Sequence, residues 1–120
     1  MTSYDPQNIF ARILRGEIPS RKVYEDEHVL AIHDAFPQAS IHILVLPKGA
    51  YVSMSDFTAQ ASDAEIVALN RAVAKIVRET GLQDGGYRVI ANAGAHGGQE
   101  VPHLHLHIVG GEKLGPMLPK

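Results

Sequence analysis

The sequence predicts an α+β fold with an antiparallel sheet of about five strands. Two segments with apolar residues at helical spacing alternate with short stretches rich in β-branched residues, in the order helix, strands, helix, strands. The last two strand-like stretches are close in sequence, which favours antiparallel pairing. The length of 120 residues suits one core. We therefore expect a single domain over residues 1–120, with a short C-terminal tail from about 112 and the helices packed on one face of the sheet.

One short and one long helix are expected. In "NIFARILRGE", Asn8 can cap the start and Gly16 can end the helix, while four apolar side chains share one face: Ile9, Phe10, Ile13 and Leu14. The long helix begins after Ser62, which forms a capping box with Glu65, and ends near Gly81.

Five segments are expected to form strands. They are residues 22–27, 28–34, 41–49, 85–94 and 102–111. A polar turn joins the first two into a hairpin, and the loop "AGAHGGQE" joins the last two. In the final segment, "PHLHLHIVGG", Pro102 suits the first position of a strand because it has no N–H to donate to the ladder.

Composition excludes several classes of function. Apolar residues make up 45% and charged residues 20%, and no apolar run approaches the ~20 residues of a membrane helix. The start of the chain does not resemble a secretory signal, so we expect a cytoplasmic protein without a membrane partner. The formal charge of −2 disfavours nucleic acid as a partner and favours a small ligand. The absence of cysteine leaves only histidine and carboxylate as metal ligands.

Three histidines alternate with apolar residues in "VPHLHLHIVGG". On a strand, His103, His105 and His107 would share one face while the intervening residues, Leu104, Leu106 and Ile108, enter the core. Three solvated histidines on an exposed face are one interpretation, although threonine, lysine or glutamate would be more usual there. The others are a metal site and a catalytic site.

A metal site would have to overcome the spacing of these histidines. On a strand the Cα atoms of the outer pair lie ~13 Å apart, whereas zinc requires nitrogens at ~2 Å. Two of the histidines with a remote ligand remain an alternative. We expect neither a metal nor another cofactor.

Nucleophilic catalysis by neutral imidazole is the third interpretation. The preceding loop, "NAGAHGGQE", has small residues whose backbone N–H groups can surround an anion, and Asn92 and Gln99 add side-chain donors. The loop lacks the Gly-Lys-Ser/Thr of a triphosphate-binding loop. Its glycines could equally serve only to shape a hairpin. Together, the histidines and the loop favour chemistry at phosphorus.

His42 is a further candidate. It alternates with Leu44 and Leu46 and so occupies the core-like face of its strand. Such a histidine is either a satisfied core residue or a partner that orients one of the other three rings.

The motif "HLHLHIVGG" after "GGQEVP" resembles that of the histidine-triad (HIT) family. The segments "IFARILRGEIP", "VYEDEHVLAIHD", "PQASIHILVLPK" and "YRVIANAGAHGGQEV" are similar to the Hint branch of that family, in the same order. The resemblance covers most of the chain and is weakest over residues 51–60 and after 111. It implies a HIT-like α+β unit whose sheet continues across a homodimer to ten strands.

The resemblance also implies an activity. Hint proteins favour purine nucleoside phosphoramidates, which they hydrolyse to a nucleoside monophosphate and an amine. By position in the motif, His105 would attack the α-phosphorus and become nucleotidylated. His103, His107 and His42 would orient it and manage protons, and water would then release the nucleotide.

The same comparison assigns a nucleotide pocket. The phosphate would lie near Asn92, Gly98, Gln99, Glu100 and Val101. Asp34 would accept the ribose hydroxyls, His33 would lie beside the ribose, and five apolar residues would enclose the purine: Ile9, Phe10, Ile13, Ile18 and Ile32. Periodicity alone also allows Phe10 and Ile13 to be core residues, and Asp34 to be a turn residue.

Two departures from the better-known animal members concern this pocket and its surroundings. Glu100 replaces a serine and brings charge near an anionic substrate, and Ala50 replaces a histidine outside the triad.

Two other functions remain open. One is the cleavage of dinucleoside polyphosphates, as in the Fhit branch. The other is a non-catalytic, purine-nucleotide-binding regulatory module.

Overall fold

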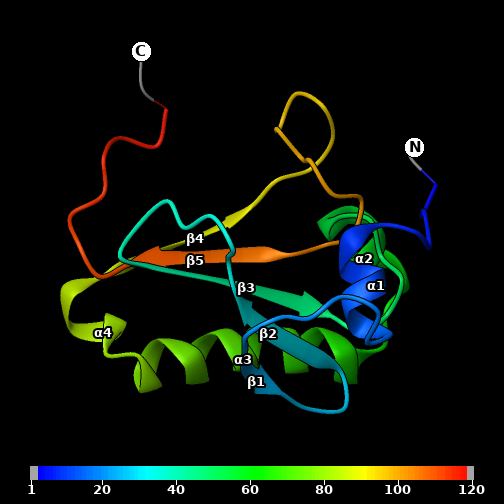
Figure 1. Cartoon of the computed structure of the whole chain (residues 1–120), viewed down its shortest axis with the longest axis horizontal. Coiled ribbons are helices and arrows are strands. Elements are labelled where there is room, and N and C mark those ends of the chain that lie inside the picture. The colour runs from blue at the N-terminus through cyan, green and yellow to red at the C-terminus, as the bar shows by residue number, and fades with distance from the viewer. Residues whose placement is uncertain (1–2, 119–120) are drawn as a thin grey trace.

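A five-stranded antiparallel sheet with strand order β1-β2-β3-β5-β4 forms the centre of the protein, whose computed structural model describes residues 3–118 (Figure 1). This architecture confirms the predicted α+β class. In chain order the elements are α1 (Ile9–Leu14), β1 (Lys22–Glu25), β2 (Val29–His33), β3 (Ile41–Pro47), α2 (Met54–Gln60), α3 (Asp63–Glu79), α4 (Leu82–Gly85), β4 (Tyr87–Ala91) and β5 (Leu106–Gly110). No helix within residues 3–118 has the length and apolar character needed to cross a membrane.

Both predicted helices form where their capping residues place them. Asn8 caps α1 by accepting a hydrogen bond from the N–H of Ala11 at 2.9 Å, and Gly16 follows the helix with a φ of 79°. Ser62 and Glu65 form the predicted capping box at the start of α3. Local side-chain chemistry therefore fixes the start of each helix.

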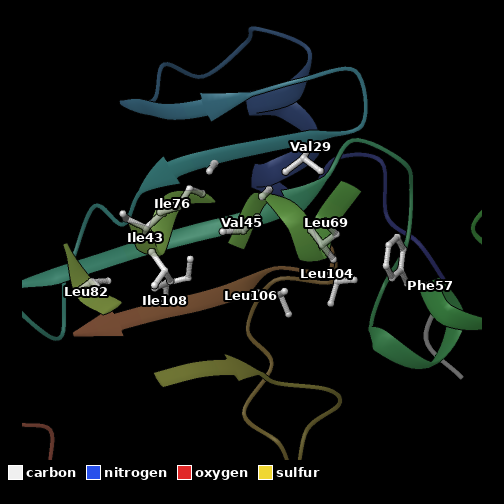
Figure 2. Close-up of a cluster of buried hydrophobic side chains, with 13 residues drawn as sticks. Val29, Ile43, Val45, Phe57, Leu69, Ile76, Leu82, Leu104, Leu106 and Ile108 are labelled. Atoms are coloured by element: carbon white, nitrogen blue, oxygen red, sulfur yellow. The ribbon is translucent and has the colours of Figure 1, made fainter. Parts of the chain in front are cut away.

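The helices cover both faces of the sheet, so the prediction of a single covered face was wrong. Helix α3 packs on the face that carries Val29 and Val45, in a core completed by residues such as Phe57, Leu104 and Ile108 (Figure 2). On the opposite face, Phe10 of α1 packs against residues of β2 and β3: Leu30, Ile32, Leu44 and Leu46. Because β2 and β3 are buried on both faces, their sequences are almost continuously apolar.

Helices α2 and α4 were not predicted. Helix α2 begins where the carboxylate of Asp56 accepts the backbone N–H groups of Val52 and Ser53, and it places Phe57 in the core. Helix α4 has four residues, too few to show an apolar period, and it places Leu82 in the same core. Each of these short helices thus adds one buried side chain to the core against which α3 packs.

The final strand is shorter than predicted, and this changes the setting of the histidines. Strand β5 begins at Leu106 rather than near residue 102, so only His107 of the triad lies in the ladder. Before it, the N–H of Leu104 donates to the carbonyl of Tyr51 at 2.8 Å instead of to a neighbouring strand. The residues from Val101 to His105 are therefore held by tertiary contacts.

Candidate active site

A cavity of about 850 Å³ opens on the face of the sheet that α1 covers only in part. Helix α1 has six residues, and beyond it the floor of the cavity carries His42, Leu44 and His107. Every predicted site residue except His103 lines this cavity: Ile9, Phe10, Ile13, Ile18, Ile32, His33, Asp34, His42, Asn92, Gly98, Gln99, Glu100, Val101, His105 and His107.

His105 presents an unprotonated nitrogen. Its Nδ1 lies 2.7 Å from the backbone oxygen of His103, and because a carbonyl only accepts, this Nδ1 carries the hydrogen. The lone pair of the neutral ring is therefore on Nε2. Burial lowers the pKa of His105 below its ordinary value of 6.5, despite the opposing effects of the hydrogen bond to His103 and of the charges of Asp34 and Glu100, so the ring is neutral at pH 7. The edge of Phe10 packs against it at a centroid distance of 4.7 Å.

His42 and His107 form a hydrogen-bonded pair whose tautomers follow from one backbone contact. The N–H of Gln38 donates to Nδ1 of His42 at 3.0 Å, so the hydrogen of His42 is on Nε2. That Nε2–H donates to Nδ1 of His107 at 2.9 Å, which leaves the hydrogen of His107 on its own Nε2. Burial, together with the nearby His105 and His42, lowers the pKa of His107 to about 4. His107 is thus a neutral donor at the cavity.

His103 is buried beneath the site and does not face the cavity. Its side chain is completely buried and is absent from the cavity lining. Nε2 lies 2.8 Å from the carbonyl oxygen of Pro47 and therefore donates, and Nδ1 accepts from the hydroxyl of Tyr4 at 2.7 Å. Burial lowers the pKa of His103, so this ring also stays neutral.

The glycine-rich loop is braced by Gln99. The side-chain oxygen of Gln99 accepts from the N–H of Gly94 at 3.0 Å, while its amide nitrogen donates to the carbonyls of Val52 and Val101. These side-chain donors hold the loop. Gly98 has a φ of 75°, so it also shapes the turn. The N–H groups of Gly98 and Gln99 donate to the carbonyls of Ala95 and Gly94, so they hold the loop, and Glu100 and Val101 follow them in the cavity lining.

Asp34 combines two of its predicted features. One carboxylate oxygen accepts the N–H of Phe36 at 2.7 Å, as a turn residue would. The other lies 3.5 Å from Nε2 of His42, and the residue lines the cavity. Phe10 is similarly both a core residue and a wall of the cavity.

Asp34, His42 and His107 are the described residues grouped closely enough to hold a metal ion, with ligand atoms within 4.8 Å of one another. This group contains only one member of the triad, because His103 is buried behind the cavity and Nδ1 of His105 bonds the carbonyl of His103. One ion could use both histidine nitrogens only if it displaced the hydrogen that joins them. The arrangement therefore favours a hydrogen-bonded pair.

Several lining residues were missed by sequence reasoning. They are Pro19, Ser20, Arg21, Ala35, Phe36, Gln38 and Leu44. Gln38 fixes the tautomer of His42 through its backbone, which no side-chain pattern can reveal. Tyr4, which contacts His103, is 99 positions away from it in sequence.

The C-terminal tail borders a second cavity of about 360 Å³ beside the first. Leu114, Gly115 and Pro116 line it together with Arg88, whose guanidinium donates to the carbonyl of Gly115 at 3.0 Å. His42 and His107 lie between the two cavities, since both cavities include them. Residues 114–116 of the tail thus lie beside His42 and His107, and residues 119 and 120 are outside the described part of the chain.

Known proteins are similar to this chain in sequence and in fold. The sequence model of the HIT domain matches residues 15–114. An uncharacterized 13.2 kDa HIT-like protein of Azospirillum brasilense is 58% identical over 118 residues, which cover 98% of this chain and 97% of that protein. The purine nucleoside phosphoramidase of Escherichia coli K12 is 44% identical over 112 residues, or 93% of each chain.

A solved structure, that of a histidine triad protein from Clostridium difficile, superposes with a TM-score of 0.83 at 44% identity. The match covers 97% of this chain and all of the other. The triad sequence, the five-stranded sheet and these similarities agree, and the chain belongs to the HIT family.

Proposed function

We propose that the protein is a hydrolase that cleaves purine nucleoside phosphoramidates to a nucleoside monophosphate and an amine, through a nucleotide bound covalently to His105. The observation that carries the proposal is the tautomer of His105, whose Nδ1–H is held by the carbonyl of His103 so that Nε2 is free to attack. The similarity to a purine nucleoside phosphoramidase of Escherichia coli supports the substrate class.

In the first step, Nε2 of His105 forms a bond to the α-phosphorus and the phosphorus–nitrogen bond breaks. The electron pair of that bond goes to the departing nitrogen. The Nε2–H of His107, whose ring His42 orients, can donate a hydrogen bond to this nitrogen but keeps its hydrogen, because a neutral ring that lost it would become an imidazolate. The departing nitrogen takes one proton from solvent and leaves as the amine.

In the second step, water attacks the phosphorus of the nucleotidyl-histidine. The phosphorus–nitrogen bond to His105 breaks, its electron pair returns to Nε2, and the water releases one proton. In both steps the phosphate oxygens would lie near Glu100 and Val101, which line the cavity, whereas the N–H groups of Gly98 and Gln99 donate within the loop to the carbonyls of Ala95 and Gly94. The nucleoside monophosphate then dissociates.

The remaining cavity residues suit a purine nucleoside. Ile9, Ile13, Ile18 and Ile32 form an apolar end of the cavity large enough for a base. Asp34 offers the carboxylate oxygen nearest His42 to the ribose hydroxyls while its other oxygen holds the turn. Glu100, an exposed residue of the lining, places a negative charge beside the phosphate.

We also propose that the active protein is a homodimer in which two sheets join along β4. This strand is an edge of the sheet, and it exposes 46% of Tyr87 and 41% of Val89. An edge strand with exposed apolar side chains readily pairs with a second chain. The join would continue the sheet to ten strands.

Removal of the His105 side chain tests the nucleophile. With an amine-linked adenylate, the wild type should release adenosine monophosphate and show a nucleotide adduct by mass spectrometry after quenching. His105→Ala should form no adduct and lose at least about 10³-fold in turnover, because the covalent route is closed.

His28→Ala is the matched control, since His28 does not line the cavity. It should retain both turnover and adduct. An adduct on the His105→Ala protein would contradict the assignment. Faster wild-type turnover on dinucleoside polyphosphates would favour the second hydrolase, and nucleotide binding without turnover would favour the regulatory module.

The pH dependence of kcat/KM tests the protonation state. His105 must be neutral to attack, and its pKa is lowered by burial, so activity should persist below pH 6.5 and fall only as the lowered pKa is passed. An acidic limb centred at or above 6.5 would contradict a buried, neutral nucleophile. Uncatalysed hydrolysis at each pH must be subtracted, and circular dichroism must show that the protein remains folded.

Light scattering coupled to size exclusion tests the dimer. The wild type should have twice the chain mass of 13.0 kDa, and Val89→Lys should shift the protein toward monomer by placing a charge on the β4 edge. Thr58→Lys, on exposed α2, is the control and should remain dimeric. A monomeric wild type at micromolar concentration would contradict the proposed assembly.

A further inference from the structure

Tyr4 connects the N-terminal segment to the triad. Its hydroxyl lies 2.7 Å from Nδ1 of His103, and the two rings meet edge to face with centroids 5.6 Å apart. Tyr4 precedes α1 and lies outside residues 15–114, the part of the chain that matches the HIT domain. The family match therefore assigns this contact no role.

The direction of this hydrogen bond is fixed by the other side of the ring. Nε2 of His103 donates to the carbonyl of Pro47 at 2.8 Å, so Nδ1 of the neutral ring has only a lone pair. The hydroxyl of Tyr4 must then donate to Nδ1. Both nitrogens of a fully buried imidazole are satisfied in this way, and one tautomer is selected.

The position of His103 matters because the strand ladder does not hold it. Residues 101–105 precede β5, yet the carbonyl of His103 orients the attacking ring of His105. The ring contacts of His103 with Pro47 and Tyr4 and the backbone bond from Leu104 to Tyr51 restrain this stretch. Tyr4 thus makes one of the contacts that hold the His103 carbonyl in place and so fix the orientation of the His105 ring.

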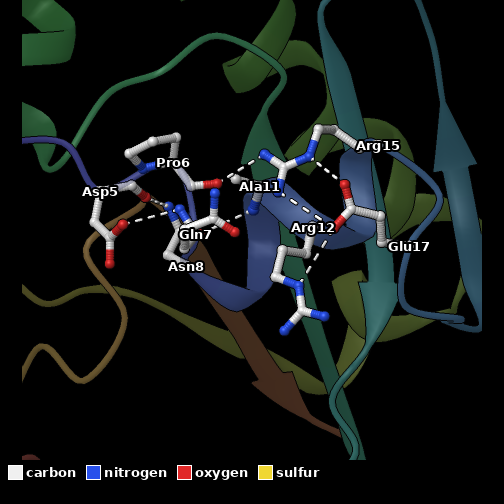
Figure 3. A network of polar contacts seen from close by, with 8 residues as sticks. All are labelled: Asp5, Pro6, Gln7, Asn8, Ala11, Arg12, Arg15 and Glu17. Carbon is white, nitrogen blue, oxygen red and sulfur yellow. Dashed lines mark hydrogen bonds and ion pairs between the residues drawn. The ribbon is translucent and has the colours of Figure 1, made fainter.

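The segment that carries Tyr4 is itself anchored to α1. Asn8 donates through its backbone and side-chain nitrogens to the carbonyl of Asp5, and Arg15 donates to the carbonyl of Pro6 at 2.7 Å (Figure 3). Helix α1 in turn packs Phe10 against His105. The segment that carries Tyr4 is therefore held against α1, and this holds the Tyr4 hydroxyl near His103.

We propose that Tyr4 is a positioning residue for the reaction. It fixes the tautomer and the position of His103 and, through the His103 carbonyl, the orientation of the His105 ring. This inference rests on the proposed function, because it assigns to Tyr4 an effect on the attack by His105. Tyr4 does not line the cavity, so its effect should fall on turnover and not on substrate affinity.

The test compares wild type, Tyr4→Phe and Tyr24→Phe with an amine-linked adenylate as substrate. Tyr4→Phe keeps the ring and removes only the hydroxyl, so kcat should fall about 5- to 30-fold while KM stays within about twofold. Tyr24→Phe is the matched control, because it also removes a hydroxyl that donates a hydrogen bond, in this case to the carboxylate of Asp26, and Tyr24 does not line the cavity. It should leave both constants unchanged.

Nitrogen-15 NMR of histidine-labelled protein provides a readout that does not depend on turnover. In wild type, His103 should show a protonated Nε2 and an unprotonated Nδ1 that accepts a hydrogen bond. Tyr4→Phe should shift the His103 and His105 signals and leave those of His28 in place.

Unchanged kcat in Tyr4→Phe, a loss confined to KM, or equal losses in both variants would overturn the inference. If wild type shows no turnover, the proposed function fails, and the NMR comparison still decides the role of Tyr4. Unchanged His103 and His105 signals would then overturn it. A protonated Nδ1 on His103 in wild type would overturn it directly, without any variant.

Discussion

The hydrogen bond from Nδ1 of His105 to the backbone oxygen of His103 is the contact on which the proposed chemistry depends. It assigns the lone pair of His105 to Nε2, as the proposed attack on phosphorus requires, without help from a carboxylate. The same logic extends around the triad, where a carbonyl orients His103 and a backbone N–H orients His42. Because these partners belong to the backbone, the fold itself sets the protonation pattern of the site. Burial then keeps the triad rings neutral by making the charged imidazolium costly.

The fold creates this site by leaving one face of its sheet incompletely covered. Helix α3 has 17 residues and packs across one face, whereas α1 has six and covers only part of the other. The uncovered part carries His42 and His107 at the centre of the sheet, where strands on both sides restrain the backbone. His105 and the glycine-rich loop close the cavity from the side. A rigid sheet and a tethered loop thus meet at the place where the phosphate would bind.

Sequence alone predicted the strands in their order along the chain, the helices α1 and α3, and most of the cavity lining. Those features arise from local signals: capping side chains, alternation on strands and a motif shared with a family. The start of β5 was missed because alternation continues through His103 and His105, although tertiary contacts, not the ladder, hold them. The second covered face was missed because α1 shows the same periodicity whichever face it packs against. Tyr4 and Gln38 were missed because their contacts with histidine depend on the folded chain and leave no periodic signal.

The stereochemical course at phosphorus tests the covalent route most directly. An adenosine phosphorothioamidate of known configuration, hydrolysed by the wild type in oxygen-18 water, gives a product whose configuration can be assigned. Attack by His105 followed by attack of water comprises two in-line displacements, each of which inverts phosphorus, so net retention is expected. Net inversion would mean that water attacks the substrate in a single displacement, with the triad acting only on protons and charge.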